Sequence, residues 1–180
     1  LLEFWTKQKG VGELIKILLD EGCQVFVRPH RDSRDYISKK MDQIKNNYLS
    51  NKNFYWLEGE SSNKYLIRSQ ILITDWSGAA FSFSFGLGRP VISVDLPPKI
   101  NNLEYKKFIN EPFEITMREK IGLVINPDRI ENITKIVHDI KTNYRFYSKN
   151  IIEPRNNYIY NFGKSAEKGA QYLAKLTQTI

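Results

Sequence analysis

The hydrophobic pattern of this chain takes two alternating forms, and each predicts a different kind of element. Short, mostly apolar runs predict buried strands, and they cover residues 24–27, 54–57, 71–74 and 91–94. Segments with apolar residues three and four positions apart predict amphipathic helices. These segments cover residues 11–20, 34–47, 64–68, 129–141 and 165–177, and a further helix of small and aromatic residues is predicted at 77–87.

The order of these segments predicts the fold class. Strands and helices alternate, and glycine or proline bounds most of them, as in βαβ units with parallel strands. We therefore expect an α/β, Rossmann-like parallel sheet with helices on both faces. Residues 99–118 are rich in proline and asparagine and predict an irregular segment, and Pro154 predicts a break before the closing helix.

Length and composition indicate a single globular domain. The 180 residues suffice for one substantial core, whereas two full domains would be cramped. Hydrophobic residues make up 41%, and no apolar run reaches the ~20 residues that span a bilayer. The chain opens on Leu1 without a signal peptide or an initiating methionine, so we expect a piece of a longer protein.

The single cysteine and the excess of positive charge restrict the partners. Cys23 stands alone, which excludes an intramolecular disulfide or a cysteine metal cluster and predicts a buried residue in a reducing, intracellular location. With 27 basic and 20 acidic residues the net charge is +7, so an anionic partner is expected. A nucleotide phosphate, an anionic membrane and nucleic acid all satisfy this charge. The aromatic residues lie in apolar runs rather than along a basic stripe, which argues against nucleic acid.

Basic residues follow the first predicted strand. Ligands of open parallel sheets bind beyond the carboxyl ends of strands, and here the chain carries Arg28, His30, Arg31 and Arg34. Guanidinium groups bind diphosphates through paired hydrogen bonds, and histidine adds a titratable donor. A solvated basic loop is the alternative, and the position after a buried strand favours binding.

A second candidate site follows the strand at 71–74. Asp75 or Ser77 can cap the next helix, and Gly78 lets a ligand approach the backbone. The first-turn amides and the helix dipole would then favour an anion. An ordinary N-cap looks much the same.

Three further residues are candidates by position. Asp95 follows the strand at 91–94, where an acidic group can accept ribose hydroxyls, although a capping or surface role fits equally well. Glu111 and Arg118 lie in the long irregular segment and could bind a nucleoside and a phosphate, or be plain surface charges. His138 falls on the polar side of its helix and is expected to be solvated.

Several common motifs are missing from the sequence. It contains no Walker loop, GxGxxG fingerprint, metal-binding cluster or serine-hydrolase elbow. This argues against most kinases, dehydrogenases and hydrolases, and we expect neither a metal nor a cofactor.

The remaining motifs form an ordered set along nearly the whole chain. They are Val27-Arg28-Pro29-His30, Leu72-Ile73-Thr74-Asp75-Trp76-Ser77-Gly78-Ala79-Ala80, Gly88-Arg89-Pro90-Val91-Ile92, Pro98-Lys99-Ile100-Asn101-Asn102, Glu111-Pro112, Arg118-Glu119-Lys120-Ile121-Gly122 and Asn161-Phe162-Gly163. In this order they resemble the bacterial CDP-glycerol glycerophosphotransferase family, the polymerases and primases of teichoic-acid and related capsule-like polymers.

The resemblance implies a two-lobed fold of the glycosyltransferase-B type. Residues 1–180 would be a single nucleotide-donor-binding domain, the carboxyl-terminal lobe, and the cleft between the lobes would hold a polymer or lipid-linked acceptor. The acceptor hydroxyl would attack the β-phosphate of CDP-glycerol, and CMP would leave. Such a protein would work in the bacterial cytoplasm, peripherally on the inner face of the membrane, where Lys106 and Lys107 could add electrostatic attachment.

The resemblance also implies roles for individual residues. His30 would be the catalytic residue that stabilises the departing phosphate, and Ser77 and Gly78 would bind the diphosphate. The other implied donor-binding positions are Arg28, Thr74, Glu111 and Arg118. Arg31 stands where many relatives have proline, and Gly78 replaces the commoner second serine, which removes one hydroxyl donor. The family's general base lies on the amino-terminal lobe, so this chain is expected to bind donor without turnover.

Two other functions remain open on the sequence. One is a lobe of the same architecture that binds a nucleotide sugar. The other is a non-catalytic basic module that docks on an anionic surface.

Overall fold

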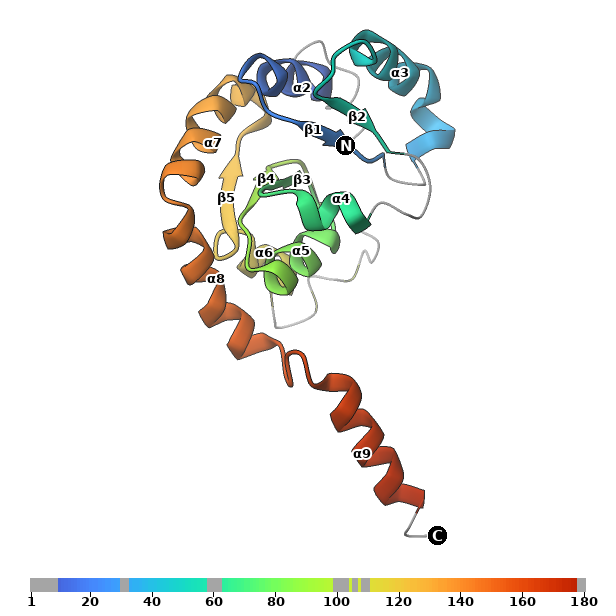
Figure 1. The fold of residues 1–180 in the computed structure, drawn as a ribbon, viewed down its shortest axis with the longest axis vertical. Helices are drawn as coiled ribbons and strands as arrows, with labels where there is room; N and C mark the ends of the chain where they lie inside the picture. The colour runs from blue at the N-terminus through green and yellow to red at the C-terminus, as the bar shows by residue number, and fades with distance from the viewer. Residues whose placement is uncertain are drawn as a thin grey trace.

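The computed structural model describes residues 10–29, 33–57, 63–98, 104, 107 and 111–177, and Figure 1 shows their arrangement. Within these residues the strands are β1 (Val25–Val27), β2 (Phe54–Trp56), β3 (Leu72–Thr74), β4 (Val91–Val94) and β5 (Gly122–Ile125). The helices are α2 (Val11–Asp20), α3 (Ser33–Tyr48), α4 (Asn63–Arg68), α5 (Ala79–Leu87), α6 (Phe113–Met117), the 3-10 helix η3 (Pro127–Asn132), α7 (Ile133–Thr142), α8 (Tyr144–Tyr158) and α9 (Ser165–Thr177).

The described strands form two short parallel sheets. β1 pairs with β2, and β4 lies between β3 and β5. A helix stands between each pair of sequential neighbours, with α3 between β1 and β2 and α5 between β3 and β4. Because parallel neighbours need such crossover connections, this confirms the predicted α/β class with parallel strands.

The core lies on both faces of β4. Ile92 and Val94 pack on one face in a cluster with residues of α2, β1 and α7. Val91 lies on the opposite face with Phe83 of α5 and Ile151 of α8. Alternate residues of a strand point to opposite faces, so helices cover the sheet on both sides, as predicted. The first cluster also joins the two sheets, because Val25 of β1 belongs to it.

β5 is a strand that the hydrophobic pattern did not single out. Its first residue, Gly122, has low strand propensity, and it follows a segment predicted to be irregular. The structure shows why glycine is needed there. A Cβ on Gly122 would lie 1.7 Å from the backbone oxygen of Val91, its partner across the ladder.

Several details of the prediction were wrong. α8 continues through Pro154, which is buried. Proline has no N–H to donate to the Asn150 carbonyl, but Asn150 is exposed, so water can replace that donor. α7 begins at Ile133 rather than at 129, because Arg129 has non-helical angles and Pro127 opens a 3-10 turn. The segment predicted to be irregular contains the short helix α6.

The closing helix α9 forms where it was predicted, and Figure 1 shows it extending away from the body of the protein. Every residue of α9 is exposed. No helix among the described residues combines the length and apolarity needed to cross a membrane.

Candidate functional site

A recess opens at the carboxyl ends of β3 and β4. Thr74 and Ser93 pair across these two strands, so the chain leaves both at the same edge of the sheet. The recess is lined by Asp75, Trp76, Ser77, Ala80, Phe81, Ser93, Glu114, Arg118 and Ile121. The wall is therefore formed by the turn between β3 and α5 with the start of α5, by the end of β4, and by α6 with the residues that follow it. This is the place where parallel α/β sheets bind ligands.

The start of α5 forms one wall. The helix begins at Ala79, two residues later than predicted, and Gly78 occupies the N-cap position. The Ala79 N–H donates to Ser77 Oγ at 3.3 Å, and the Ala80 N–H donates to the Ser77 carbonyl at 3.0 Å. In the described part of the chain, the Gly78 N–H has no such acceptor. Two of the first-turn amides, which the sequence analysis expected to be free for an anion, are therefore already hydrogen-bonded.

Gly78 itself is exposed, and its surroundings are open. A Cβ at this position would meet no atom within 4 Å. A ligand can therefore approach this backbone amide closely, as the sequence predicted.

Arg118 is the most constrained side chain of the site. It is only 8% exposed, Nη1 donates to Asp95 Oδ1 at 3.0 Å, and Nη2 donates to the Val94 carbonyl at 2.9 Å. Its guanidinium lies 4.0 Å from the ring centroid of Trp76, within the range of a cation–π contact. Its Nε is buried without a hydrogen-bond partner.

Trp76 continues this connection. Its Nε1 donates to the Leu96 carbonyl at 2.5 Å. Arg118 and Trp76 together fasten the turn after β3 to the segment that leaves β4. The relative position of the two strand ends is therefore set by side chains that are far apart in sequence.

The predicted residues fall into groups. Three of them, Asp75, Ser77 and Arg118, line the recess. Asp95 reaches the site through its ion pair with Arg118, although its own side chain is 59% exposed. Thr74 ends β3.

The remaining predicted residues lie apart from this recess or outside the described part. Arg28 follows β1 and is exposed, and Glu111 is exposed ahead of α6; neither lines the recess. Arg34 lies in the first turn of α3, and its side chain is outside the described atoms. His30, the predicted catalytic residue, and Arg31 lie outside the described residues.

Six lining residues were missed by the sequence analysis as binding candidates, and three of these carry polar atoms in their side chains: Trp76, Ser93 and Glu114. Ser93 is 2% exposed and is the one polar residue in an apolar strand, which is a detectable signal. Glu114 stands four residues before Arg118, a spacing that places two side chains on one side of a helix. Only the fold shows that this side faces the turn after β3.

The motif Gly88-Arg89-Pro90 has a structural role. Gly88 adopts φ 65° and ends α5 in the left-handed conformation that glycine tolerates. Arg89 Nη1 donates to the Ile67 and Ser69 carbonyls at the end of α4, at 2.5 Å each. Pro90 is buried ahead of β4. This motif builds the frame of the site rather than its surface.

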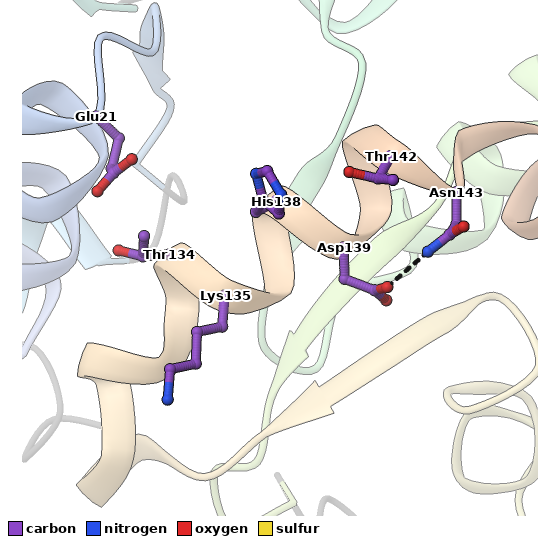
Figure 2. Close-up of a pocket in the computed structure, with 7 residues that line it drawn as sticks. All are labelled: Glu21, Thr134, Lys135, His138, Asp139, Thr142 and Asn143. Atoms are coloured by element: carbon purple, nitrogen blue, oxygen red, sulfur yellow. Dashed lines mark hydrogen bonds between the residues drawn. The ribbon is translucent and has the colours of Figure 1, made fainter.

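A second recess lies along α7, where Figure 2 shows the lining side chains. They are Glu21, Thr134, Lys135, His138, Asp139, Thr142 and Asn143. Figure 2 shows six of them spread along α7 and its end rather than turned toward one point, with Glu21 on a separate segment at the end of α2. His138 is exposed, as predicted.

In this second recess, the Asp139 carboxylate accepts hydrogen bonds from two neighbouring side chains. Asn143 Nδ2 donates to its carboxylate at 2.7 Å, and the Tyr147 hydroxyl donates to its other oxygen. The hydrogen bonds from Tyr147 and then Asn143 lower the pKa of Asp139. The same bond to Asp139 raises the pKa of Tyr147 to about 12. These contacts join α7 to α8 and leave the carboxylate little capacity for a ligand.

Two remaining observations concern possible metal ligands and the cysteine. The described residues contain no group of three or more His, Cys, Asp or Glu side chains that could hold a metal ion. Cys23 is half-buried rather than fully buried as predicted, and its sulfur lies 3.5 Å from Lys141 Nζ.

Comparison with known proteins adds no assignment. No protein-family model matches the chain, and neither the curated proteins nor the solved structures contain a match to it.

Proposed function

We propose that this chain is the donor-binding lobe of a CDP-glycerol glycerophosphotransferase of the glycosyltransferase-B type. The observation that carries the proposal is the edge of the sheet at the carboxyl ends of β3 and β4. There Ser77 and the exposed Gly78 stand at the start of α5, beside a small recess of about 10 Å³ that Ser77 and the buried Arg118 line. The proposal also rests on the ordered sequence motifs that resemble this family.

The position and the donors of the site support a nucleotide diphosphate. The Ser77 hydroxyl and the Gly78 N–H lie at the start of α5, on the edge of the sheet where such ligands bind. The net charge of +7 favours an anionic donor over a neutral one. Gly78 is exposed, so a diphosphate can approach its backbone amide from solvent.

The proposed reaction is transfer of glycerol phosphate to an acceptor hydroxyl. The acceptor oxygen forms a bond to the β-phosphorus, the bond from that phosphorus to CMP breaks, and the acceptor proton passes to a base on the amino-terminal lobe. His30 would hydrogen-bond the departing phosphate. The residues of this lobe would contribute positioning and charge stabilisation.

The proposed reaction also implies an acceptor and a cellular location. The acceptor would be a lipid-linked polymer of the cell envelope, so the enzyme would work at the inner face of a bacterial membrane. The basic surface would strengthen this attachment.

Calorimetric titration tests the proposal directly. We expect the chain to bind CMP and CDP-glycerol more tightly than a UDP-sugar or a short oligonucleotide. Ser77→Ala should weaken CDP-glycerol binding about tenfold, because one hydroxyl donor to a charged phosphate is lost. Ser82→Ala is the matched control, since Ser82 is exposed on the same helix and does not line the recess.

Each other outcome points to a different function. Preference for a UDP-sugar would assign the site to a nucleotide-sugar glycosyltransferase lobe. Salt-dependent oligonucleotide binding without nucleotide preference would assign the chain to a docking module. Failure to bind any cytidine nucleotide, or equal effects of the two serine substitutions, would overturn the donor-site proposal.

A further inference from the structure

Helix α9 carries an apolar stripe that lies open to solvent. Four residues spaced three and four positions apart share one side of the helix and form this stripe: Ala166, Gly169, Leu173 and Leu176. Every residue of α9 is exposed, and Leu173 is 64% exposed. A helix of 13 residues is marginal in water when it packs against nothing. A surface that covers the stripe would therefore stabilise α9.

The opposite side of α9 is polar and carries lysines. Lys168 Nζ donates to Gln171 Oε1 at 3.4 Å, and Gln171 Nε2 donates to Glu167 Oε1 at 2.9 Å. Lys175 lies four residues after Gln171 and therefore on the same side of the helix. A helix with an apolar stripe on one side and lysines on the other is typical of helices that lie in the plane of a membrane interface.

The turn ahead of α9 adds exposed aromatic side chains. Tyr160 and Phe162 are both exposed, and aromatic rings with one polar neighbour are favoured at the membrane–water interface. The guanidinium of Arg155 in α8 lies 4.4 Å from the ring centroid of Phe162. Asn161 and Gly163 have positive φ angles of 53° and 72°, which turn the chain sharply between the two helices. Figure 1 shows the result: α9 projects from the body of the protein, so a flat surface can reach it.

Charge distinguishes between the possible occupants of the stripe. Between residues 160 and 177 the chain carries one acidic residue, Glu167, and three lysines. The lysines are Lys164, Lys168 and Lys175. Two copies of α9 packed through their stripes would place like net charges side by side, which is unfavourable. An anionic surface would instead attract the lysines.

We propose that α9, together with Tyr160 and Phe162, binds the surface of a bilayer that contains anionic phospholipids. The helix lies in the plane of the interface, with Leu173 and Leu176 among the acyl chains and the lysines at the lipid phosphates. Its 13 residues are fewer than the ~20 that cross a bilayer, so it lies on the membrane. The inference rests on the proposed function only for the presence of a membrane, and none of its residues lines the donor recess.

Sedimentation of the full chain with lipid vesicles tests this inference. The probes are vesicles of phosphatidylcholine with about 30% phosphatidylglycerol and vesicles of phosphatidylcholine alone. We expect at least about tenfold tighter binding to the anionic vesicles at low salt, because each lysine near the surface adds attraction. This difference should shrink in about 0.5 M salt, where the charges are screened.

The Leu173→Ser variant connects vesicle binding to the stripe. It should weaken binding to the anionic vesicles about tenfold, because an apolar side chain no longer leaves water. Leu49→Ser is the matched control, since Leu49 is 56% exposed and directly follows α3. Figure 1 places α3 at the opposite end of the molecule from α9, so this control should change binding by less than about twofold. Circular dichroism checks that both variants fold.

The Lys168→Gln variant tests the contact with lipid phosphates. It should weaken binding to the anionic vesicles about fivefold at low salt and hardly at all in about 0.5 M salt. Lys52→Gln is the control, because Lys52 is exposed beyond α3 and removes the same charge. An effect of Lys168→Gln that does not depend on salt would contradict the contact with lipid phosphates.

The outcomes separate this inference from its alternatives and from the proposed function. If the chain does not bind anionic vesicles, or if the two leucine variants weaken binding equally, the assignment of α9 is wrong. If sedimentation velocity finds a dimer that Leu173→Ser dissociates, the stripe binds a second copy and the assignment is again wrong. Leu173→Ser should leave CDP-glycerol binding unchanged. A chain that binds anionic vesicles through α9 but no cytidine nucleotide would overturn the proposed function alone.

Discussion

The recess at the ends of β3 and β4 and the recess along α7 contain similar residue types but differ in how those residues are held. Both combine carboxylates, hydroxyls and a basic side chain. At the ends of β3 and β4 the groups come from several separate segments, and the buried Arg118 connects them. Along α7 nearly all the groups come from one helix and its end, and Asp139 is occupied by its neighbours.

This difference shows what distinguishes a candidate site from a polar surface. Convergence of several elements fixes side chains relative to one another, so a ligand meets groups that are already oriented. Side chains spread along one exposed helix must be ordered when a ligand binds, which costs conformational entropy. Three substitutions, each with a control, test this difference.

Gly122→Ala should have the largest effect, because it disrupts the sheet beneath the first recess. The new Cβ would lie 1.7 Å from the Val91 backbone oxygen, so β4 and β5 would have to separate. We expect the free energy of unfolding to fall by about 3 kcal/mol or more, measured by urea denaturation.

Gly86→Ala is the matched control for Gly122→Ala. Gly86 lies in α5, and its added Cβ would meet no atom within 4 Å. Alanine has the higher helix propensity, so this substitution should stabilise the protein by about 0.5–1 kcal/mol. Equal effects of the two substitutions would show that the close approach of β4 and β5 does not support the fold.

Arg118→Met should have the second-largest effect on stability. It tests whether the first recess is held more firmly than the second. It removes hydrogen bonds to Val94 and Asp95 and the contact with Trp76, at a side chain that is 8% exposed. We expect a loss of about 2 kcal/mol, because the hydrogen bonds of a charged, nearly buried side chain are lost, although the Val94 carbonyl keeps its bond from the Leu96 N–H. Chemical denaturation provides the measurement.

Arg129→Met removes the same charge from an exposed position and should change stability by less than about 0.5 kcal/mol. If Arg118→Met is equally mild, Arg118 does not hold the two strand ends together. The first recess would then be no better organised than the second.

Tyr147→Phe should have the smallest effect, and its pH dependence characterises the second recess. The bond to Asp139 raises the pKa of Tyr147 from 10.0 to about 12 and lowers that of Asp139 from 3.8. A raised pKa stabilises the fold below pH 10.0, and this contribution is lost as pH rises toward 12. A lowered carboxyl pKa stabilises the fold above pH 3.8, and this contribution is lost in acid.

The Tyr147→Phe variant should therefore melt about 2 °C below the unmodified protein near neutral pH, since solvent screens this half-buried pair in part. The difference should shrink in acid and above pH 10.0. Tyr144→Phe is the control: the Tyr144 hydroxyl donates to the Gln70 carbonyl at 3.3 Å, so its effect should persist in acid. A pH-independent difference for Tyr147→Phe would contradict the role given to Asp139.

Local patterns predicted most elements because their causes are local. The apolar spacing of α2 and the continuous apolar run of β4 each predict the element that forms. Local signals failed where neighbours in space decided the outcome. Pro154 is accommodated within a buried helix face, and Gly122 enters a strand because Val91 approaches it closely.

The candidate site divides in the same way. The turn from Asp75 to Gly78 was recognisable in the sequence, since it follows an apolar strand and precedes a helix. Glu114 was not, because nothing near it in sequence shows that α6 lies beside that turn. Asp95 was predicted as a nucleoside ligand, and the sequence did not show that Arg118 donates a hydrogen bond to its carboxylate.

The sequence by itself determined the alternation of strands and helices, the parallel α/β class and the strand end at which a ligand site was expected. These follow from periodicity and turn chemistry over a few residues. Only the tertiary structure decided that Arg118 is buried between Trp76 and Asp95, and that Glu114 shares a recess with Ser77. The reason is physical: a buried charge depends on partners that lie about twenty or more residues away and that only strand pairing and helix packing bring into contact.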